Sequence, residues 1–475
     1  MDIKAIIRSA TEIVDQLPFD LLRENDIIVD RTYDNPEAAR YFLMFADWDK
    51  VFPDDIFSNL DKTTGQRTQI YVDLPFCGKF CNFCAFYGVV PRSKEEISVY
   101  TETLKKEISL LKKLYFSQGF KADALELGGG TPTFLPLDIL KDVVGHLSRE
   151  LPFVKDHEFN FEASPETITG KEGIEKLEYL KESGADRMSI GVQSFNAEIL
   201  KNTNRPHDLD DVIEAINNAK RIGFNRINVD LIVGLEGQTI EDFIESVNKT
   251  IDFGIDIIEL YTMRYFDTKE FVPMKKRLDQ KGRFLNSREL LIARVAADRL
   301  LKKAKYSSAN GRTYESVASK YPFYAAYYEG NFKGMNTLGI GRKCNSNVYP
   351  WQYANYRNIE KYCNAINKGR LAIACGTRFT DQARVAKLLT GSFQLPGIID
   401  FDSLRANLPE EYRSLFDPLI KKLLSLGLIE KDGVGLRKTF TGFLFIEEIL
   451  KQIYDLVVTP FSNSSLFLGR KQAVR

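Results

Sequence analysis

The chain has 475 residues, with 65 Lys and Arg, 65 Asp and Glu, and a formal net charge of +0 at pH 7. Its hydrophobic content of 44% and charged content of 27% are usual for a globular protein, and its length allows two or three domains. Balanced charge argues against a strongly basic surface for nucleic acid or anionic lipid. No run approaches the roughly 18 apolar residues of a membrane span, and the first residues lack a signal-peptide core. We therefore expect a cytoplasmic location, with neither a nucleic-acid nor a membrane partner.

The first 65 residues form a mixed segment. Residues 4–24 have the pattern of an amphipathic helix. Residues 25–65 read as irregular, because they carry Pro36, Pro53 and several Asp and Asn turn residues.

Residues 69–262 alternate between strand-like and helix-like patterns. The expected strands are 69–74, 124–128, 158–162, 187–192, 226–233 and 256–261, and the expected helices are about 95–118, 137–149, 171–183, 208–222 and 239–253. Strands separated by helices in this way predict a parallel sheet that is covered on its outside. Six strands allow either a doubly wound sheet or an open barrel short of the full eight.

Three cysteines stand within eight residues, in Cys77-Gly-Lys-Phe-Cys81-Asn-Phe-Cys84. Clustered cysteines in an intracellular chain indicate metal ligands rather than disulfides. Three thiolates at this spacing can hold three irons of a [4Fe–4S] cube and leave the fourth iron open to a small chelating molecule. Reductive cleavage of S-adenosylmethionine (SAM) requires such an open iron. Structural zinc is the alternative, but it usually has four ligands and no fourth Cys or His lies nearby.

A glycine-rich stretch, Gly128-Gly129-Gly130-Thr131, follows the second expected strand. Glycines let the backbone approach a ligand closely and expose its polar groups. The stretch is either a tight turn before the next helix or, because it lies one strand after the cysteine loop, a clamp for the methionine end of SAM.

Polar residues mark the later strands. Glu162 ends the third strand, Gln193 follows the fourth, Asp230 lies within the fifth, and Arg205 precedes a helix. Charged side chains are rarely buried without a partner or ligand. An arginine can pair with the methionine carboxylate of SAM, while acids and an amide can bind its ribose hydroxyls and ammonium. The alternative for Asp230 is a structural partner inside the sheet.

The remaining chain divides into two parts. A charged segment at 264–284 and a helix near 288–304 precede a stretch at 314–356 that is dense in Tyr and Phe. That stretch is either an aromatic core or one wall of a site for a flat, apolar substrate. Residues 380–475 predict a small unit with helices at 404–408 and 412–426, a two-stranded wing from Gly427, and a last helix at 441–457. This outline also occurs in winged-helix proteins that bind DNA.

Several motifs together resemble one known family. They are Tyr71-Val-Asp-Leu-Pro-Phe-Cys77 with Cys81 and Cys84, Gly128-Gly-Gly-Thr-Pro-Thr133, Glu162-Ala-Ser-Pro165, Gly191-Val-Gln-Ser-Phe195 and Asp230-Leu-Ile-Val-Gly-Leu235. Their order over residues 66–264 is similar to that of radical SAM enzymes of the oxygen-independent coproporphyrinogen III oxidase (HemN-like) group. The resemblance implies an α/β fold with a partial (β/α)6 TIM-like barrel and a small winged-helix-like C-terminal domain. The expected division is 1–65, 66–305, 306–379 and 380–475.

The resemblance also implies roles for individual residues. Cys77, Cys81 and Cys84 would ligate a [4Fe–4S] cluster. The SAM-binding residues would be Tyr71, Phe83, Gly129, Gly130, Thr131, Glu162, Gln193, Arg205 and Asp230. A second SAM would lie near Arg264 or Cys344, and a flavodoxin- or ferredoxin-type protein would donate electrons.

Two departures from the group concern the substrate. The group usually has a histidine where this chain has Asp73, and the N-terminal arm of the true oxidases has only a degenerate relative at 30–36. The resemblance favours a small-molecule substrate related to porphyrins, with propionate decarboxylation to vinyl groups. Methylation or cyclopropanation through a second SAM, and porphyrin ring opening, are alternatives. The rivals from other classes are a non-catalytic haem or iron–sulfur carrier and a winged-helix regulator with a sensory cluster.

Overall fold

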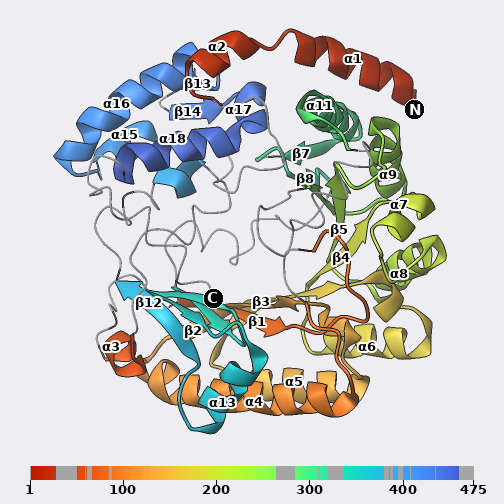
Figure 1. The fold of residues 1–475 in the computed structure, drawn as a ribbon, viewed down its shortest axis with the longest axis vertical. Helices are drawn as coiled ribbons and strands as arrows, with labels where there is room; N and C mark the ends of the chain where they lie inside the picture. Colours follow the sequence, from red (N-terminus) through yellow and green to blue (C-terminus); the bar gives the residue numbers. More distant parts are fainter. Residues whose placement is uncertain are drawn as a thin grey trace.

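Six parallel strands form the centre of the computed structural model (Figure 1). They are β1 (Arg67–Leu74), β2 (Lys121–Gly129), β3 (Phe153–Ala163), β4 (Arg187–Gln193), β5 (Arg226–Val233) and β6 (Ile257–Thr262). Each strand pairs with the next in parallel, and the sheet curves with helices on its outer side. The predicted partial barrel is thus confirmed. The structure describes residues 2–27, 51–58, 60, 67–84, 88–263, 284–308, 310–318, 336–378, 385, 389–393, 399–406, 408–433 and 435–458.

The outer helices follow the sequence pattern within a few residues. They are α4 (Lys94–Leu114), α5 (Leu137–Glu150), α6 (Gly170–Glu182), α8 (Leu209–Ile222), α9 (Ile240–Asp252) and α11 (Ser287–Lys303). Helix α8 shows why: Asp208 caps its first turn, and Gly223 ends it with a φ of +83° that an L side chain rarely adopts. The short α7 (Ala197–Asn202), which the sequence pattern did not predict, is capped in the same way by Asn196.

The sheet extends beyond the six strands on both sides. On one side β9 (Asn336–Ile340) pairs in parallel with β1, and β10 (Asn345–Val348), β11 (Trp351–Asn355) and β12 (Ile373–Arg378) continue from it. On the other side β8 (Thr313–Ser316) pairs with β6, and β7 (Tyr306–Ser308) pairs with β8. The hydrogen-bonded sheet therefore continues past residue 305, where we expected a boundary, and the division into domains stays a prediction.

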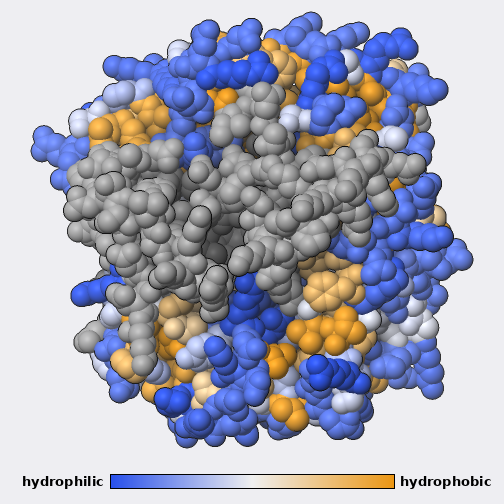
Figure 2. All heavy atoms as spheres, viewed as in Figure 1, coloured by the Kyte–Doolittle hydropathy of each residue, from blue (hydrophilic) through white to orange (hydrophobic). Residues whose placement is uncertain are grey.

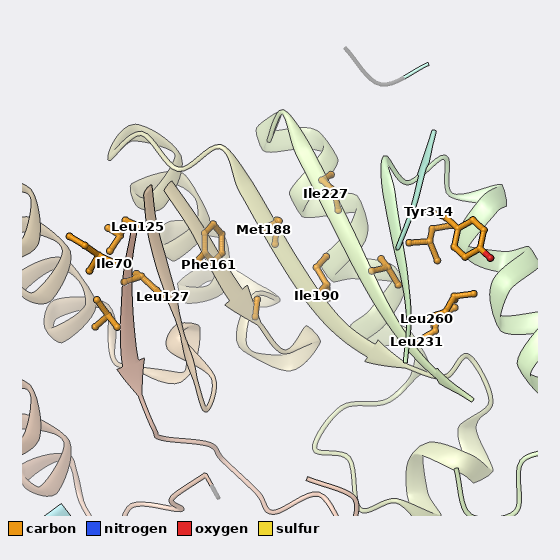
Figure 3. Packing of buried hydrophobic residues seen from close by; sticks show 14 of the residues in the cluster. Ile70, Leu125, Leu127, Phe161, Met188, Ile190, Ile227, Leu231, Leu260 and Tyr314 are labelled. Carbon is orange, nitrogen blue, oxygen red and sulfur yellow. The ribbon is translucent and has the colours of Figure 1, made fainter. Parts of the chain in front are cut away.

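Apolar side chains from successive strands fill the layer between the sheet and its helices (Figure 3). The labelled residues come from β1 to β6 and β8: Ile70, Leu125, Leu127, Phe161, Met188, Ile190, Ile227, Leu231, Leu260 and Tyr314. Burial of one such side chain contributes about 1.5–3 kcal/mol. Tyr314 and Tyr353 are buried in this core, and Tyr314 donates to Asp298 Oδ1 (3.0 Å). These two aromatic residues therefore fit the core interpretation, while the aromatic residues at 321–332 lie outside the described part.

The predicted N-terminal helix is two helices, α1 (Ile3–Asp15) and α2 (Phe19–Glu24). The break falls at Pro18, which cannot donate a backbone hydrogen bond and stands at the start of α2. Helix α1 packs on α11 and α9, and Arg288 on α11 donates to Asp15 at the end of α1 (2.5 Å). Within the expected irregular segment, α3 (Pro53–Phe57) is a further short helix.

The C-terminal unit has the predicted helices and wing. It contains α15 (Phe401–Ala406), α16 (Glu410–Ser425), β13 (Ile429–Asp432), β14 (Gly435–Lys438), α17 (Phe440–Leu444) and α18 (Ile446–Val458). The last two replace the single helix expected at 441–457, since Phe445 leaves the helical conformation and turns inward to be fully buried. Arg294 on α11 donates to the Leu444 carbonyl (3.0 Å), which fixes this unit to the barrel.

Among the residues that Figure 2 colours by hydropathy, polar ones predominate on this face and hydrophobic ones form separate patches. Helix α13 (Ile359–Asn367) packs on α4 beside the strand extension. None of the helices in the described ranges has the length and apolar content to cross a membrane.

Candidate active site

The three cysteines lie on a loop that leaves the carboxyl end of β1 and returns beside it. Backbone hydrogen bonds from Cys77 N to Val89 O (2.9 Å) and from Val89 N to Pro75 O (2.7 Å) close the loop. Cys77, Cys81 and Cys84 are half-buried free thiols. Burial raises the pKa of Cys77 to about 11, so its thiol stays protonated until a bound cation favours the thiolate.

Residues at the end of α7 hold this loop from the opposite side of the barrel mouth. Asn82 donates from its backbone to Thr203 O (3.0 Å) and from its side chain to Asn202 O (3.0 Å). The Asn204 amide donates in turn to Phe80 O (2.5 Å). Because Asn204 has a φ of +57°, which asparagine tolerates better than most residues, this short segment can turn sharply beneath the loop.

The glycine-rich stretch touches the cysteine loop directly. Gly129 has a φ of +106°, and a Cβ on Gly130 would fall 2.5 Å from the carbonyl carbon of Pro75, so both positions require glycine. Thr131 directs its hydroxyl toward Cys77 Sγ at 3.7 Å. The structure therefore brings together the loop, Gly129, Gly130 and Thr131, as the sequence predicted.

Arg205 lies between the cysteine loop and the ends of β3 and β4. Its Nη1 is 3.1 Å from Cys81 Sγ, and its Nη2 donates to Gly191 O (2.5 Å) and Ser164 Oγ (3.2 Å). Its Nε is buried and has no hydrogen-bond partner among the described residues. A buried unpaired donor is costly, and a carboxylate ligand would satisfy it.

Glu162 stands at the carboxyl end of β3, inside the barrel. A Cβ on Gly128 would fall 2.8 Å from Glu162 Oε1 and 2.7 Å from the Tyr71 hydroxyl, so these two side chains converge over the glycine. Burial, and after it the charges of Glu126 and Asp230, raise the pKa of Glu162 to about 8. Glu162 is therefore largely protonated near neutral pH when no ligand is bound.

Asp230 points into the barrel and is held by neighbouring polar side chains. Its Oδ1 accepts from Asn228 Nδ2 (2.6 Å), and its Oδ2 accepts from Ser189 Oγ (3.0 Å). Burial, with the charge of Glu259 as the next cause, raises the pKa of Asp230 to about 7. These fixed neighbours orient the carboxyl group, which suits recognition of a hydroxyl or ammonium group.

Gln193 and Phe83 complete the set that the sequence predicted. Gln193 has a φ of +69°, unusual for a residue other than glycine, and its Oε1 is buried without a hydrogen-bond partner in the described structure. Phe83, on the cysteine loop, packs on a small apolar cluster at the ends of β5 and β6: Ile199, Ile232, Leu235 and Met263, with Tyr261 and Phe284. The mouth of the barrel thus has one apolar side and one polar side.

The donor set fits a [4Fe–4S] cluster and SAM. In the described ranges, no three His, Cys, Asp or Glu side chains are gathered as a site for a single metal ion. In a cube each of three thiolates binds a different iron, which requires wider spacing than one ion does. The unpaired Arg205 Nε and Gln193 Oε1 are a donor and an acceptor that the methionine and ribose groups of SAM can satisfy.

Some residues near the site were missed from the sequence. His207 lies behind Arg205, with Nδ1 3.3 Å from Arg205 Nη2 and 3.5 Å from Glu166 Oε2. Lys343 follows β9. Burial lowers its pKa, while the nearby negative charges of Asp73 and Cys84 act in the opposite direction. In the sequence, the only feature that places His207 near the site is its position two residues after Arg205. No sequence feature does so for Lys343. Arg264 lies outside the described residues, and Cys344 is buried, so the second SAM stays a prediction.

Comparison with known proteins agrees with this site. Residues 71–250 match the radical SAM superfamily, a range that begins at Tyr71 and includes the three cysteines and Asp230. This range of the chain is therefore similar to radical SAM domains. The match and the named relatives identify an enzyme that uses a [4Fe–4S] cluster and SAM.

Within that superfamily the chain is related to oxygen-independent coproporphyrinogen III oxidases. It is 24% identical to the Pseudomonas aeruginosa protein of that name over 90% of this chain and 94% of that one. It is 26% identical to the Escherichia coli K12 protein over 80% of this chain and 84% of that one. The solved structure of coproporphyrinogen III oxidase (HemN) from Escherichia coli superposes with a TM-score of 0.72 and 22% identity, over 82% of this chain and 90% of that one, which supports the same fold.

Proposed function

We propose that Cys77, Cys81 and Cys84 ligate the cluster and that Arg205 receives the methionine carboxylate of SAM. Glu162, Gln193 and Asp230 would bind the SAM ammonium and ribose, while Tyr71, Phe83 and the stretch from Gly129 to Thr131 would line the site. The observation that carries this proposal is the position of Arg205: its Nη1 is 3.1 Å from Cys81 Sγ, and its buried Nε has no hydrogen-bond partner in the described part of the chain. When bound, the cluster supplies the electron that cleaves SAM to methionine and a 5′-deoxyadenosyl radical, which takes a hydrogen atom from a substrate carbon.

The protein's own groups position SAM and limit water. Arg205 holds one end of SAM at the cysteine loop, and the Asn228–Asp230–Ser189 group provides a fixed acceptor deeper in the barrel. Fixed dipoles of this kind need little reorganisation during reaction. The apolar cluster around Phe83 covers one side of the mouth, which limits access of water to a reactive radical.

The substrate we propose is a porphyrinogen with propionate side chains, such as coproporphyrinogen III. Similarity to a coproporphyrinogen III oxidase over nine-tenths of the chain supports this choice. Loss of a hydrogen atom and carbon dioxide from each propionate would leave a vinyl group and transfer one electron to an outside acceptor. A flavodoxin- or ferredoxin-type protein would reduce the cluster, and the cytoplasmic location expected from the sequence would keep it reduced.

Labelled SAM and coproporphyrinogen III test this reaction. Reduced, reconstituted protein is incubated without oxygen, with SAM that carries label in its methyl group, and products are weighed by mass spectrometry. We expect 5′-deoxyadenosine and label wholly in methionine. The porphyrinogen products should be lighter than the substrate by the mass of carbon dioxide plus two hydrogen atoms for each of the one or two propionates converted. Label in the porphyrin product, with S-adenosylhomocysteine, would instead establish methyl transfer and overturn decarboxylation. Protein lacking the three cysteines is the control.

A further inference from the structure

The Arg205 guanidinium is held from behind by groups of the protein. Its Nη2 alone contacts three acceptors: Gly191 O at 2.5 Å, Ser164 Oγ at 3.2 Å and His207 Nδ1 at 3.3 Å. Nη1 is 3.1 Å from Cys81 Sγ, and Nε is buried with no hydrogen-bond partner among the described residues. One nitrogen is therefore saturated by the protein, which leaves the other two for a ligand.

The contacts of His207 fix which of its ring nitrogens carries the proton. Its Nε2 is 3.2 Å from Val192 O, and a carbonyl oxygen only accepts, so Nε2 carries a hydrogen. Burial lowers the pKa of His207 and outweighs the opposing effect of Glu166, whose Oε2 lies 3.5 Å from Nδ1, so the ring is neutral and Nδ1 keeps its lone pair. His207 is only 4% exposed, so its ring is not accessible to a molecule that enters from solvent.

Glu166 and Ser164 form the rest of the support. Ser164 Oγ donates to Glu166 Oε2 at 2.5 Å and accepts from Arg205 Nη2. The pKa of Glu166 is lowered despite its burial, because Ser164 donates to its ionised form and the positive charge of Arg205 lies nearby. A serine whose hydrogen is committed to a carboxylate has its lone pairs left for the arginine.

We propose that His207 is a positioning residue that, with Ser164 and Glu166, orients Arg205 so that it receives the carboxylate of SAM. This inference rests on the proposed function of Arg205. It does not place His207 in contact with SAM, the cluster or the substrate. An arginine without this support would keep its charge but lose the fixed direction that a charge-assisted pair requires.

Two substitutions of His207 separate its contacts. In His207→Asn the amide oxygen can take the place of Nδ1, whereas in His207→Gln the amide nitrogen can take the place of Nε2. We expect His207→Ala and His207→Gln to weaken SAM binding by about 3- to 10-fold, the loss of one hydrogen bond, and His207→Asn to recover most of it. His146→Ala, on the outer helix α5, is the matched control.

Binding is measured by calorimetry on anaerobic cluster-loaded protein, with SAM and with decarboxylated SAM, which lacks the carboxylate. Thermal unfolding of each variant verifies the fold. We expect His207→Ala, His207→Gln and Arg205→Ala to lose affinity for SAM but not for the decarboxylated ligand. Arg205→Ala without effect would overturn the proposed function itself. If Arg205→Ala weakens SAM while the His207 variants bind normally, or lose both ligands equally, the positioning role is wrong.

Discussion

Asp73 Oδ2 lies 3.6 Å from Arg342 Nε, across the seam between β1 and β9. Both side chains are buried, and the Tyr100 hydroxyl donates to Asp73 O (2.9 Å) beside them. Burial raises the pKa of Asp73 to about 6, so the group is mostly ionised at pH 7. The aspartate that departs from the related group's usual histidine therefore belongs to a pair that joins the strand extension to the cysteine-bearing strand.

Replacement of one member of this pair should be more harmful than replacement of both. Asp73→Ala leaves the Arg342 guanidinium buried without its carboxylate, which typically costs about 3–5 kcal/mol. We expect the double variant Asp73→Ala, Arg342→Met to recover part of that loss. Urea unfolding at pH 7 of the parent, both single variants and the double variant measures the coupling. Additive effects would show that the two residues do not stabilise each other.

The cysteines should divide into two groups by their iron content. Replacement of Cys77, Cys81 and Cys84 together by Ala should abolish iron binding, because no other cysteine lies on their loop. Cys344→Ala, Cys363→Ala and Cys375→Ala should each retain about four irons per chain after anaerobic reconstitution. Colorimetric iron assay and the absorbance of the cluster provide the measurement. Iron at the parent level in the triple variant would place the cluster elsewhere.

Asp230 should contribute to SAM binding without affecting the cluster. Asp230→Asn replaces a carboxyl group that Ser189 and Asn228 hold in place, and removes the negative charge that this group carries when it is ionised. We expect SAM affinity to fall by roughly 10- to 150-fold, the range for a hydrogen bond to a charged group. Equilibrium dialysis with labelled SAM measures it, and Asp210→Asn, on the exposed side of α8, is the control. Unchanged affinity would leave Asp230 a structural residue of the barrel.

Glu126 should make the ligand-free protein less stable as the pH rises. Burial raises its pKa to about 7, and its Oε2 has no hydrogen-bond partner among the residues described. The folded state therefore holds the proton more tightly than the unfolded state, and stability falls as the pH rises from about 4.5 to about 7. We expect Glu126→Gln to be more stable than the parent at pH 8 by about 1–3 kcal/mol, with little difference near pH 5. Urea unfolding between pH 5 and 8 tests this.

The matched control for that series is Glu245→Gln, since Glu245 is exposed on α9. It should follow the parent at every pH. A parent whose stability did not decline between pH 5 and pH 7, or a Glu126→Gln variant with the same decline, would contradict the role assigned to the buried carboxyl group.

The barrel was predictable because strand-like and helix-like patterns alternate along the chain, and the helices α4, α8 and α9 begin at side-chain N-caps. The strand extension was missed, since β9 to β12 are four to six residues long and are stabilised by pairing with distant strands. The breaks at Pro18 and Phe445 reflect one residue each, and only the first has a local signal. The break at Phe445 depends on tertiary packing, because its side chain is fully buried in the hydrophobic core.

The residues of the site also differ in how far the sequence predicts them. Cys77, Cys81, Cys84 and Gly128 to Thr131 are predictable because their chemistry lies in short, contiguous motifs. His207, Ser164 and Glu166 meet Arg205 only because the ends of β3 and β4 lie side by side in the folded sheet. Because these residues come from separate parts of the chain, no motif with a fixed residue spacing could predict their contact with Arg205.

The pairing of β9 with β1 has a consequence for how the chain can be divided. Gene fragments that stop after residue 305 would retain every motif of the SAM site and yet expose β1 as a bare edge, with its backbone donors and acceptors open. Such edges template association with other chains. We therefore expect that shortened versions will aggregate rather than act as minimal catalysts, and that strands β9 to β12 cannot be exchanged between relatives as a separate unit.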